Sequence, residues 1–188
     1  MEEERVKSAL ELAMERIAGM PELTPEEIAG QKEKECRAMG EALCNNYMQG
    51  NTGAGNLLPE LQRHHGGQGL IVRDALVACL RRSIRFDDRA SSEKAIDGLL
   101  GIMASGGDRR ERVLASWRRL CGEYEQHRET LRKEFERAAA KHLADLGIAG
   151  SAVVPNINHD EAFTEASAGL CRSFEPRLEE FAKLAAGQ

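Results

Sequence analysis

Aromatic residues are scarce in this chain, and their scarcity favours helices over sheets. They make up 4% of the 188 residues, against 41% for hydrophobic residues as a whole. The core therefore has to rest on Leu, Ala, Ile, Val and Met, a set that suits helices better than strands. Charged residues, at 30%, keep the composition within the range of globular proteins. We expect one all-α domain that covers residues 1–188.

Long apolar runs are also missing. No stretch approaches the roughly 20 residues needed to cross a bilayer, and the chain opens with Glu2–Glu4 instead of the basic start of a signal peptide. Cys-x-x-Cys spacing is absent from the five cysteines, which are Cys36, Cys44, Cys79, Cys121 and Cys171. Because their number is odd and most lie on the apolar phase of expected helices, they fit reduced thiols that pack as small hydrophobic groups. We expect a cytoplasmic protein with no membrane contact and no disulfide framework.

Motifs with a known catalytic mechanism are absent as well. The sequence has no Gly-Lys pair and hence no P-loop, no Gly-x-Ser-x-Gly elbow and no His-Glu-x-x-His pair. The turn Gly53–Gly55 lacks the third glycine of a dinucleotide-binding fingerprint. No histidine stands three residues after a glutamate, as a di-iron bundle requires. We therefore predict no cofactor and no metal site and favour a protein that is not an enzyme, although catalytic groups are recognised by spatial arrangement rather than by spacing.

A strong excess of positive charge is missing too. The formal net charge is −5, but residues 63–137 hold 16 basic and 12 acidic groups between two acidic ends. A nucleic-acid-binding protein usually shows a larger basic excess than this. The sequence thus does not favour nucleic acid as a partner, and neutralisation of one segment by another is the simpler interpretation.

Apolar residues at spacings of three and four predict a bundle of about six amphipathic helices joined by irregular, uncharged connectors. The expected helices cover residues 2–19, 24–50, 57–63 (starting near Pro59), 69–86, 91–103 (capped by Ser91 or Ser92), 108–146 and 158 onward. Capping boxes mark three helix starts, namely Thr24 with Glu27, Asp108 with Glu111 and Asn158 with Glu161. Only residues 152–155 suggest a short strand, and Pro176 should kink or divide the last helix.

The helix at about 108–146 is too long for a compact monomer. It would be about 57 Å long at 1.5 Å per residue, whereas a compact domain of this size is about 42 Å across. Since its apolar stripe runs to both ends, something has to cover the overhang, and a second copy in a homodimer is the partner we favour. The alternatives are that the helix is broken or that the second and last helices cover it.

The predicted seam of this dimer contains Trp117, Tyr124, His127 and Leu131. A neutral His127 within an apolar contact should lose stability when it is protonated, which would make association sensitive to pH. Glu123, four residues before it, is the carboxylate that could compensate.

Two uncharged segments raise a different hypothesis. Only Glu60 and Arg63 are charged between residues 42 and 72, and residues 147–158 carry no charge. The neutral amides in such segments can cap helix ends and satisfy buried backbone groups. They can also line a pocket for a neutral or peptide-like ligand, and the residues predicted for that pocket are Asn45, Tyr47, Asn51, Asn56 and His64.

Two functions from different classes follow from these patterns. The first is a non-catalytic, homo-oligomeric interaction or scaffold protein, which the long amphipathic stripes and the missing catalytic motifs favour. The alternative is a small-molecule-binding helical regulator or enzyme, with its site near the uncharged segments 42–72 and 147–158. The sequence names neither a reaction nor a ligand.

Overall fold

The protein is almost entirely helical. The computed structural model describes Ser8, Leu10, Glu11, Met14 and residues 24–103, 106–148, 150 and 153–187. Over these residues the chain forms six α-helices and one short 3-10 helix, η1, and no strand. In chain order they are α2 (Pro25–Met48), α3 (Ala54–Gln62), α4 (Gly66–Arg82), α5 (Arg89–Ile102), α6 (Gly107–Asp145), η1 (Ile157–His159) and α7 (Glu161–Ala185). The expected all-α bundle of about six helices with one long helix is confirmed.

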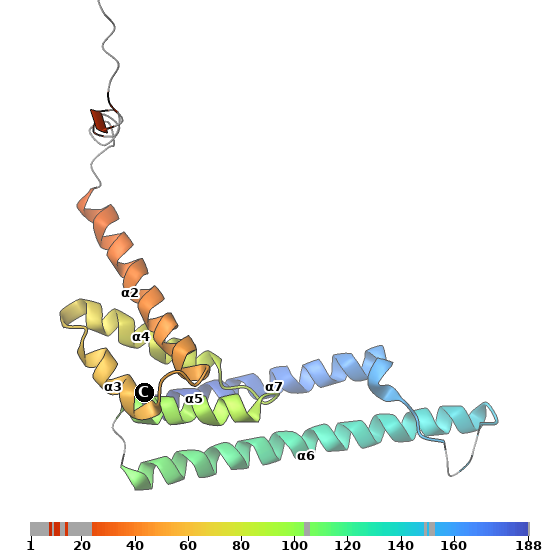
Figure 1. Ribbon diagram of the computed structural model, residues 1–188. Helices are drawn as coiled ribbons and strands as arrows, with labels where there is room; N and C mark the ends of the chain where they lie inside the picture. The colour runs from red at the N-terminus through yellow and green to blue at the C-terminus, as the bar shows by residue number, and fades with distance from the viewer. Residues whose placement is uncertain are drawn as a thin grey trace, which may run out of the picture.

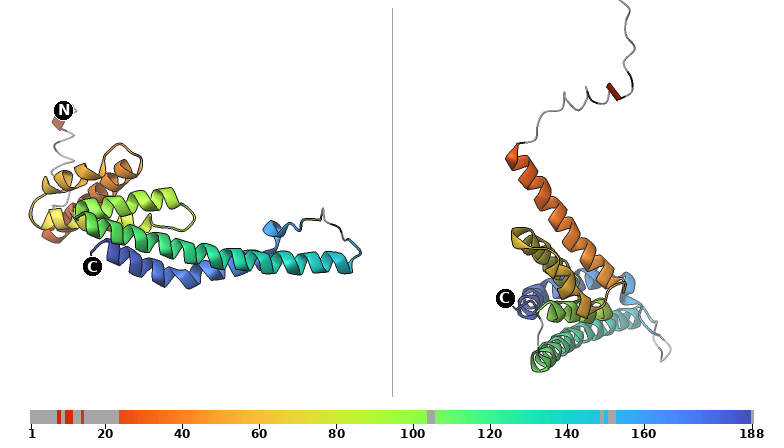
Figure 2. Two further views of the ribbon diagram at one scale, coloured as in Figure 1. Left: turned by 90° about the horizontal axis from the view of Figure 1, so that it is seen from below. Right: turned by 60° about the vertical axis from the view of Figure 1, so that its left-hand side comes forward.

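The helices divide into a body and an arm (Figure 1). The body consists of α2–α5, residues 107–124 of α6 and residues 174–187, which are the end of α7 and the two residues that follow it. The arm consists of residues 125–148 and 153–173, in which α6 and α7 continue side by side and antiparallel beyond the body (Figure 2). The long helix is unbroken over 39 residues. No helix in the described ranges combines the length and the apolarity that crossing a lipid bilayer requires.

The buried side chains lie almost entirely in the body. One core cluster joins residues of all six α-helices and includes Leu57, Leu76, Leu80, Ile96 and Leu99. The buried residues of α6 are Val113, Trp117, Leu120 and Cys121, all in its body half. Among the described arm residues only Ile157 is buried. The apolar stripe of α6 therefore continues into the arm, but complete burial stops at Cys121.

The closest contact in the body is between α2 and α4. Gly40 of α2 lies so near the Val72 carbonyl of α4 that a Cβ atom there would collide with it. One turn later a disulfide joins Cys44 to Cys79, with Cα atoms 6.2 Å apart. The expectation of five reduced cysteines is therefore wrong for this pair, because two cysteines 35 positions apart in the sequence meet only once α2 and α4 have packed. Since disulfides are typical of oxidising compartments, these two cysteines do not support the cytoplasmic expectation.

The cap of α2 is the one predicted. The Glu27 amide donates to Thr24 Oγ1 at 3.2 Å, and the Thr24 amide donates to Glu27 Oε2 at 2.8 Å. The last residue of the helix is Met48, its C-cap is Gln49, and Gly50 has a left-handed φ of 88°.

The other predicted caps are wrong, and each true cap lies a few residues away. Helix α6 follows Gly106, without a side-chain cap from Asp108. Helix α7 is capped by Asp160, whose carboxylate accepts from the Ala162 and Phe163 amides, while Asn158 lies in η1. Helix α5 is capped by Asp88. In α5 and α7 the capping group is a carboxylate. Its negative charge interacts favourably with the helix dipole, whereas the uncharged amide of Asn158 or hydroxyl of Ser91 or Ser92 would not.

Helices α3 and α4 also begin earlier than their sequence pattern predicts. Helix α3 starts at Ala54 rather than near Pro59, and α4 covers Gly66–Arg82 rather than 69–86. In both cases small or polar residues that carry no periodic signal form the first turn. Of the predicted strand at 152–155, the described residues from Val153 on are irregular.

The end of α6 is the one that the sequence predicts. Gly147 has φ 80°, its amide donates to the Ala144 carbonyl, and the Ile148 amide donates to the Leu143 carbonyl at 2.9 Å. These are the two hydrogen bonds of a Schellman motif, which ends α6. Helix α7, by contrast, continues through Pro176, so the expectation that this proline could divide the last helix is wrong. Pro176 is exposed, so water can hydrate the carbonyl that its missing N–H leaves without a partner.

The predicted helix at 2–19 lies mostly outside the described residues. Leu10, Glu11 and Met14 are helical. The Ser8 amide donates to Glu11 Oε2 at 2.7 Å and the Glu11 amide donates to Ser8 Oγ at 3.2 Å, as in a capping box.

Candidate functional site

An aromatic seam holds α6 and α7 together where the body meets the arm. Phe86, from the connector between α4 and α5, stacks on Tyr124 at 4.3 Å and on Trp117 at 5.9 Å between ring centroids. From α7, Phe174 meets the edge of Tyr124 at 5.3 Å and Phe181 lies 5.3 Å from Trp117. Offset and edge-to-face pairs at such distances add to the stability that burial alone provides.

The residues predicted for an oligomer seam divide at this point. Trp117 is fully buried within its own chain, and Tyr124 is half-buried against Phe86 and Phe174. His127 is exposed, although its ring lies 5.6 Å from that of Phe174, and Leu131 is half-buried in the arm. Helix α7 thus provides the cover expected from another helix for Trp117 and Tyr124, whereas His127 and Leu131 remain accessible to a second chain.

The surface between the body halves of α6 and α7 is hollowed into a groove of about 500 Å³, called the α6–α7 groove here. Its lining is apolar at the floor and charged along the edges. The lining residues are Ser116, Arg119, Leu120, Glu123, Arg177, Glu180, Phe181, Lys183 and Leu184. The groove lies beside the aromatic seam, because Phe181 takes part in both.

Glu123 is held by two arginines at the edge of the groove. It accepts a hydrogen bond from Arg119 Nε at 3.0 Å and a short one from Arg177 on α7. These two hydrogen bonds, from Arg177 first and Arg119 second, lower the pKa of the Glu123 carboxyl below its usual range. The carboxylate therefore links α6 to α7 at the groove edge, and it is bound to arginines rather than to His127.

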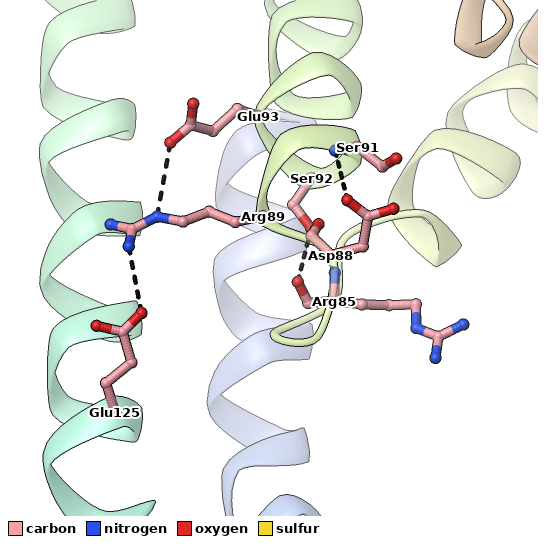
Figure 3. A network of polar contacts seen from close by, with 7 residues as sticks. All are labelled: Arg85, Asp88, Arg89, Ser91, Ser92, Glu93 and Glu125. Carbon is pink, nitrogen blue, oxygen red and sulfur yellow. Dashed lines mark hydrogen bonds and ion pairs between the residues drawn. The ribbon is translucent and has the colours of Figure 1, made fainter. Parts of the chain in front are cut away.

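A second polar network connects α5 to α6 on the body side (Figure 3). The buried Ser92 hydroxyl accepts from the Arg85 amide at 2.8 Å and lies 2.7 Å from the Arg85 carbonyl. Arg89 reaches across to α6, where its Nη1 lies 3.2 Å from Glu125 Oε1. Glu125 is the first residue of the arm, so this ion pair joins the body to the base of the arm.

The five residues predicted to line a ligand pocket differ in their exposure to solvent. Tyr47 is buried, and its hydroxyl donates to the Lys94 carbonyl at 2.7 Å, while Asn45, Asn51 and Asn56 are exposed and His64 is half-buried. Burial and nearby Asp97 raise the pKa of Tyr47 to about 12. Within the described part of the chain, no hydrogen bond joins one of these five residues to another.

The two uncharged segments lie at opposite ends of the molecule. Residues 42–72 form parts of α2, α3 and α4 in the body, whereas the described residues of 147–158 lie at the far end of the arm (Figure 1). One site cannot draw on both segments. The ligand-binding alternative therefore has no shared location in this fold and stays a sequence-based prediction.

The remaining thiols offer no cluster of ligating groups. Cys36 and Cys121 are buried and Cys171 is exposed. Burial raises the pKa of the Cys121 thiol to about 11, which keeps it protonated and unreactive at neutral pH. In the described ranges, no three His, Cys, Asp or Glu side chains come together as a metal site would require.

Sequence reasoning missed two partners of the candidate surface. Phe86 was expected at the end of a helix, but it lies in a connector and inserts between α6 and α7. Arg177 contacts Glu123 across 54 positions of sequence, and no local pattern indicates that contact. The Arg119–Glu123 pair, by contrast, has the i,i+4 spacing of neighbours on one helix face and could have been found.

The arrangement is thus an arm with a half-buried apolar seam that leads into a groove with an apolar floor and charged edges. No family model, no curated protein and no solved structure matches this chain.

Proposed function

We propose that this protein is a non-catalytic, homo-oligomeric scaffold in which the arm is the self-associating element. The observation that carries the proposal is the change in burial along α6. Its body half has four buried residues, and its arm half, from Glu125 to Asp145, has none.

The arm has an apolar seam that two helices cannot enclose. Leu131, Phe135 and Leu143 of α6 and Phe163 and Leu170 of α7 are all half-buried. The Phe135 and Phe163 rings are in contact at 5.4 Å, so the seam is formed but open at its sides. Helix pairs gain most of their stability from a packed apolar face, and further helices are needed to remove such a seam from water.

A second copy is the partner that supplies these helices in matching form. Two arms that pack against each other form a four-helix bundle, which is a common way to bury two half-covered seams. Closed twofold dimers dominate among soluble oligomers, because one surface then serves both chains. The body, with its own core and disulfide, would hold the arm in a fixed orientation.

The mass of the protein in solution tests this proposal. Light scattering coupled to size-exclusion chromatography at micromolar concentration should give at least twice the chain mass of 20.7 kDa. A Leu131→Asp variant should lower the measured mass toward that of one chain, because a carboxylate cannot be buried unpaired in the bundle. Wild-type protein that stays monomeric would overturn the proposal.

A matched control separates the arm from a general effect of the substitution. Leu70 on α4 is 61% exposed and lies in the body, so Leu70→Asp should leave the measured mass unchanged. Circular dichroism of both variants should show the helix content of the wild type, which confirms that the chain still folds.

A further inference from the structure

We propose that in the dimer the apolar end of each arm, formed by Leu146 and Ile148, occupies the α6–α7 groove of the other chain. This inference rests on the proposed function and adds the register of the dimer. Both halves of the contact, the arm end and the groove, are then present on every copy.

The arm end is apolar and exposed, and backbone hydrogen bonds hold its turn. Leu146 is 62% exposed and Ile148 is 51% exposed. The turn that carries both side chains is held to α6, because the Gly147 and Ile148 amides donate hydrogen bonds to carbonyls of the last helical turn. Large apolar side chains held in a fixed turn at the end of a projecting arm suit insertion into a matching hollow.

The α6–α7 groove is such a hollow. Leu120 and Phe181 form its floor, and Leu184 at its edge is 51% exposed. Its volume of about 500 Å³ leaves room for two aliphatic side chains. Nothing in the described part of the same chain fills it.

The spacing of arm end and groove suits a twofold pair. Leu120 at the groove and Leu146 at the arm end are 26 positions apart, and the helix between them is continuous, so they lie about 39 Å apart along its axis. Two antiparallel copies related by a twofold axis near Lys133 would place each arm end at the other chain's groove. Such a contact closes on itself, so it predicts a dimer rather than a fibre.

Charge also favours this antiparallel register. Residues 142–171 contain Asp145, Asp160, Glu161 and Glu165 and no lysine or arginine. Residues 107–120 contain five arginines and two acidic residues, and the groove lining itself has three basic residues, Arg119, Arg177 and Lys183, against Glu123 and Glu180. The proposed register brings the acidic end of one chain to the basic end of the other, whereas a parallel register would bring like charges together.

The buried area agrees with that of a stable dimer. The overlap would be about 39 Å long and about 20 Å wide, the width of two helices. This corresponds to roughly 800 Å² on each chain, which is the size of a standard specific interface.

Two variants and their mixture test the register. Leu146→Asp alters the arm end, and Ser116→Trp fills the groove from an exposed position. Each variant alone should dimerise at least about tenfold more weakly than the wild type, a loss typical of a central interface residue. The Ser116→Trp chain keeps a normal arm end, and the Leu146→Asp chain keeps a normal groove. In an equimolar mixture these two parts can pair in a heterodimer, which should therefore be tighter than the homodimer of either variant.

Sedimentation velocity of the full chain at several concentrations measures these three dissociation constants, with Leu70→Asp as the control that should match the wild type. A wild-type monomer would overturn the proposed function and this inference together. A wild-type dimer that neither variant weakens would overturn this register alone. Two weakened variants without recovery in the mixture would also overturn it, because the paired contact predicts recovery.

Discussion

The body and the arm are built from the same kinds of helices but are stabilised in different ways. In the body, Trp117 is fully buried with Phe86 and Phe181 beside its ring, and a disulfide joins α2 to α4. In the arm, two antiparallel helices share an apolar seam whose side chains are only half-buried. One continuous helix, α6, belongs to both parts, so its sequence pattern alone does not distinguish them.

This difference separates a part that can fold by itself from a part that needs a partner. Burial of apolar surface provides most of the free energy of folding. The arm buries little apolar surface within one chain. The arm gains its position from the aromatic seam at Phe86 and from the Arg89–Glu125 pair at its base. The following predictions test how sharp the separation is.

The largest difference should appear between two aromatic residues on the same helix. Trp117→Ala removes a fully buried side chain from the body and should lower the free energy of unfolding by about 3–5 kcal/mol. Phe135→Ala removes a half-buried side chain from the arm and should cost about 1 kcal/mol or less in the monomer. Urea unfolding of dilute protein, followed by circular dichroism, measures both.

The outcome that would break this comparison is equal loss from the two substitutions. It would mean that the arm contributes to the cooperative core of a single chain. A Phe135→Ala variant that loses dimerisation but keeps its unfolding midpoint would sharpen the comparison instead.

The next largest effect concerns the Cys44–Cys79 disulfide of the body. It closes a loop between residues 35 positions apart, and removing such a bond should lower the free energy of unfolding by about 2–4 kcal/mol. The Cys44→Ser, Cys79→Ser double variant and the reduced wild type should both show this loss in thermal unfolding. Cys171→Ser, at an exposed free thiol on the arm, is the control that should change nothing.

Equal stability of the reduced and oxidised wild type would contradict the assignment of this bond to the core. The same measurement bears on dimerisation, since the arm lies far from α2 and α4 (Figure 1). Reduction should therefore leave the dimer dissociation constant unchanged while the body loses stability.

Local rules predicted much of the fold, but only where one segment contains the whole signal. The Thr24–Glu27 cap and the Gly147 stop were predicted correctly, because each depends on residues within a single turn. The start of α7 was predicted wrongly, because Asn158 and Asp160 are both suitable N-cap residues. Which of them caps the helix depends on how η1 packs against α6 and α7. The pairing of Cys44 with Cys79 likewise needs the α2–α4 contact, which no local pattern contains.

The candidate surface was only partly predictable for a related reason. The stripe on α6 correctly indicates a seam through Trp117 and Tyr124, but periodicity cannot tell whether the covering helix belongs to the same chain. Phe86 and Arg177 come from distant segments, so their contacts follow from topology alone. Tyr47 was predicted as a ligand contact, but its hydroxyl donates to the Lys94 carbonyl of α5. This contact also depends on how distant helices pack.

The smallest of the predicted effects compares the two tyrosines, one in the body and one where the body meets the arm. Tyr47 is 3% exposed, and its pKa is raised from 10.0 to about 12, mainly by burial, whereas burial raises the pKa of the half-exposed Tyr124 without so large a shift. A raised pKa means that the folded state holds the proton more tightly than the unfolded state. The stabilisation is therefore complete below pH 10 and is lost as the pH rises toward 12.

Tyr47→Phe should remove this alkaline loss, which we expect to be of order 1–3 kcal/mol between pH 10 and 12. At pH 8 the same variant should lose about 1 kcal/mol, because the hydrogen bond to the Lys94 carbonyl is gone. Tyr124→Phe should change the pH dependence less, since water already reaches that ring. The free energy of unfolding, measured from pH 8 to pH 11.5 for the wild type and both variants, tests this order. If Tyr124→Phe flattened the profile more than Tyr47→Phe, the ring of Tyr124 would be the better enclosed of the two, and the fully buried part of α6 would have to extend beyond Cys121.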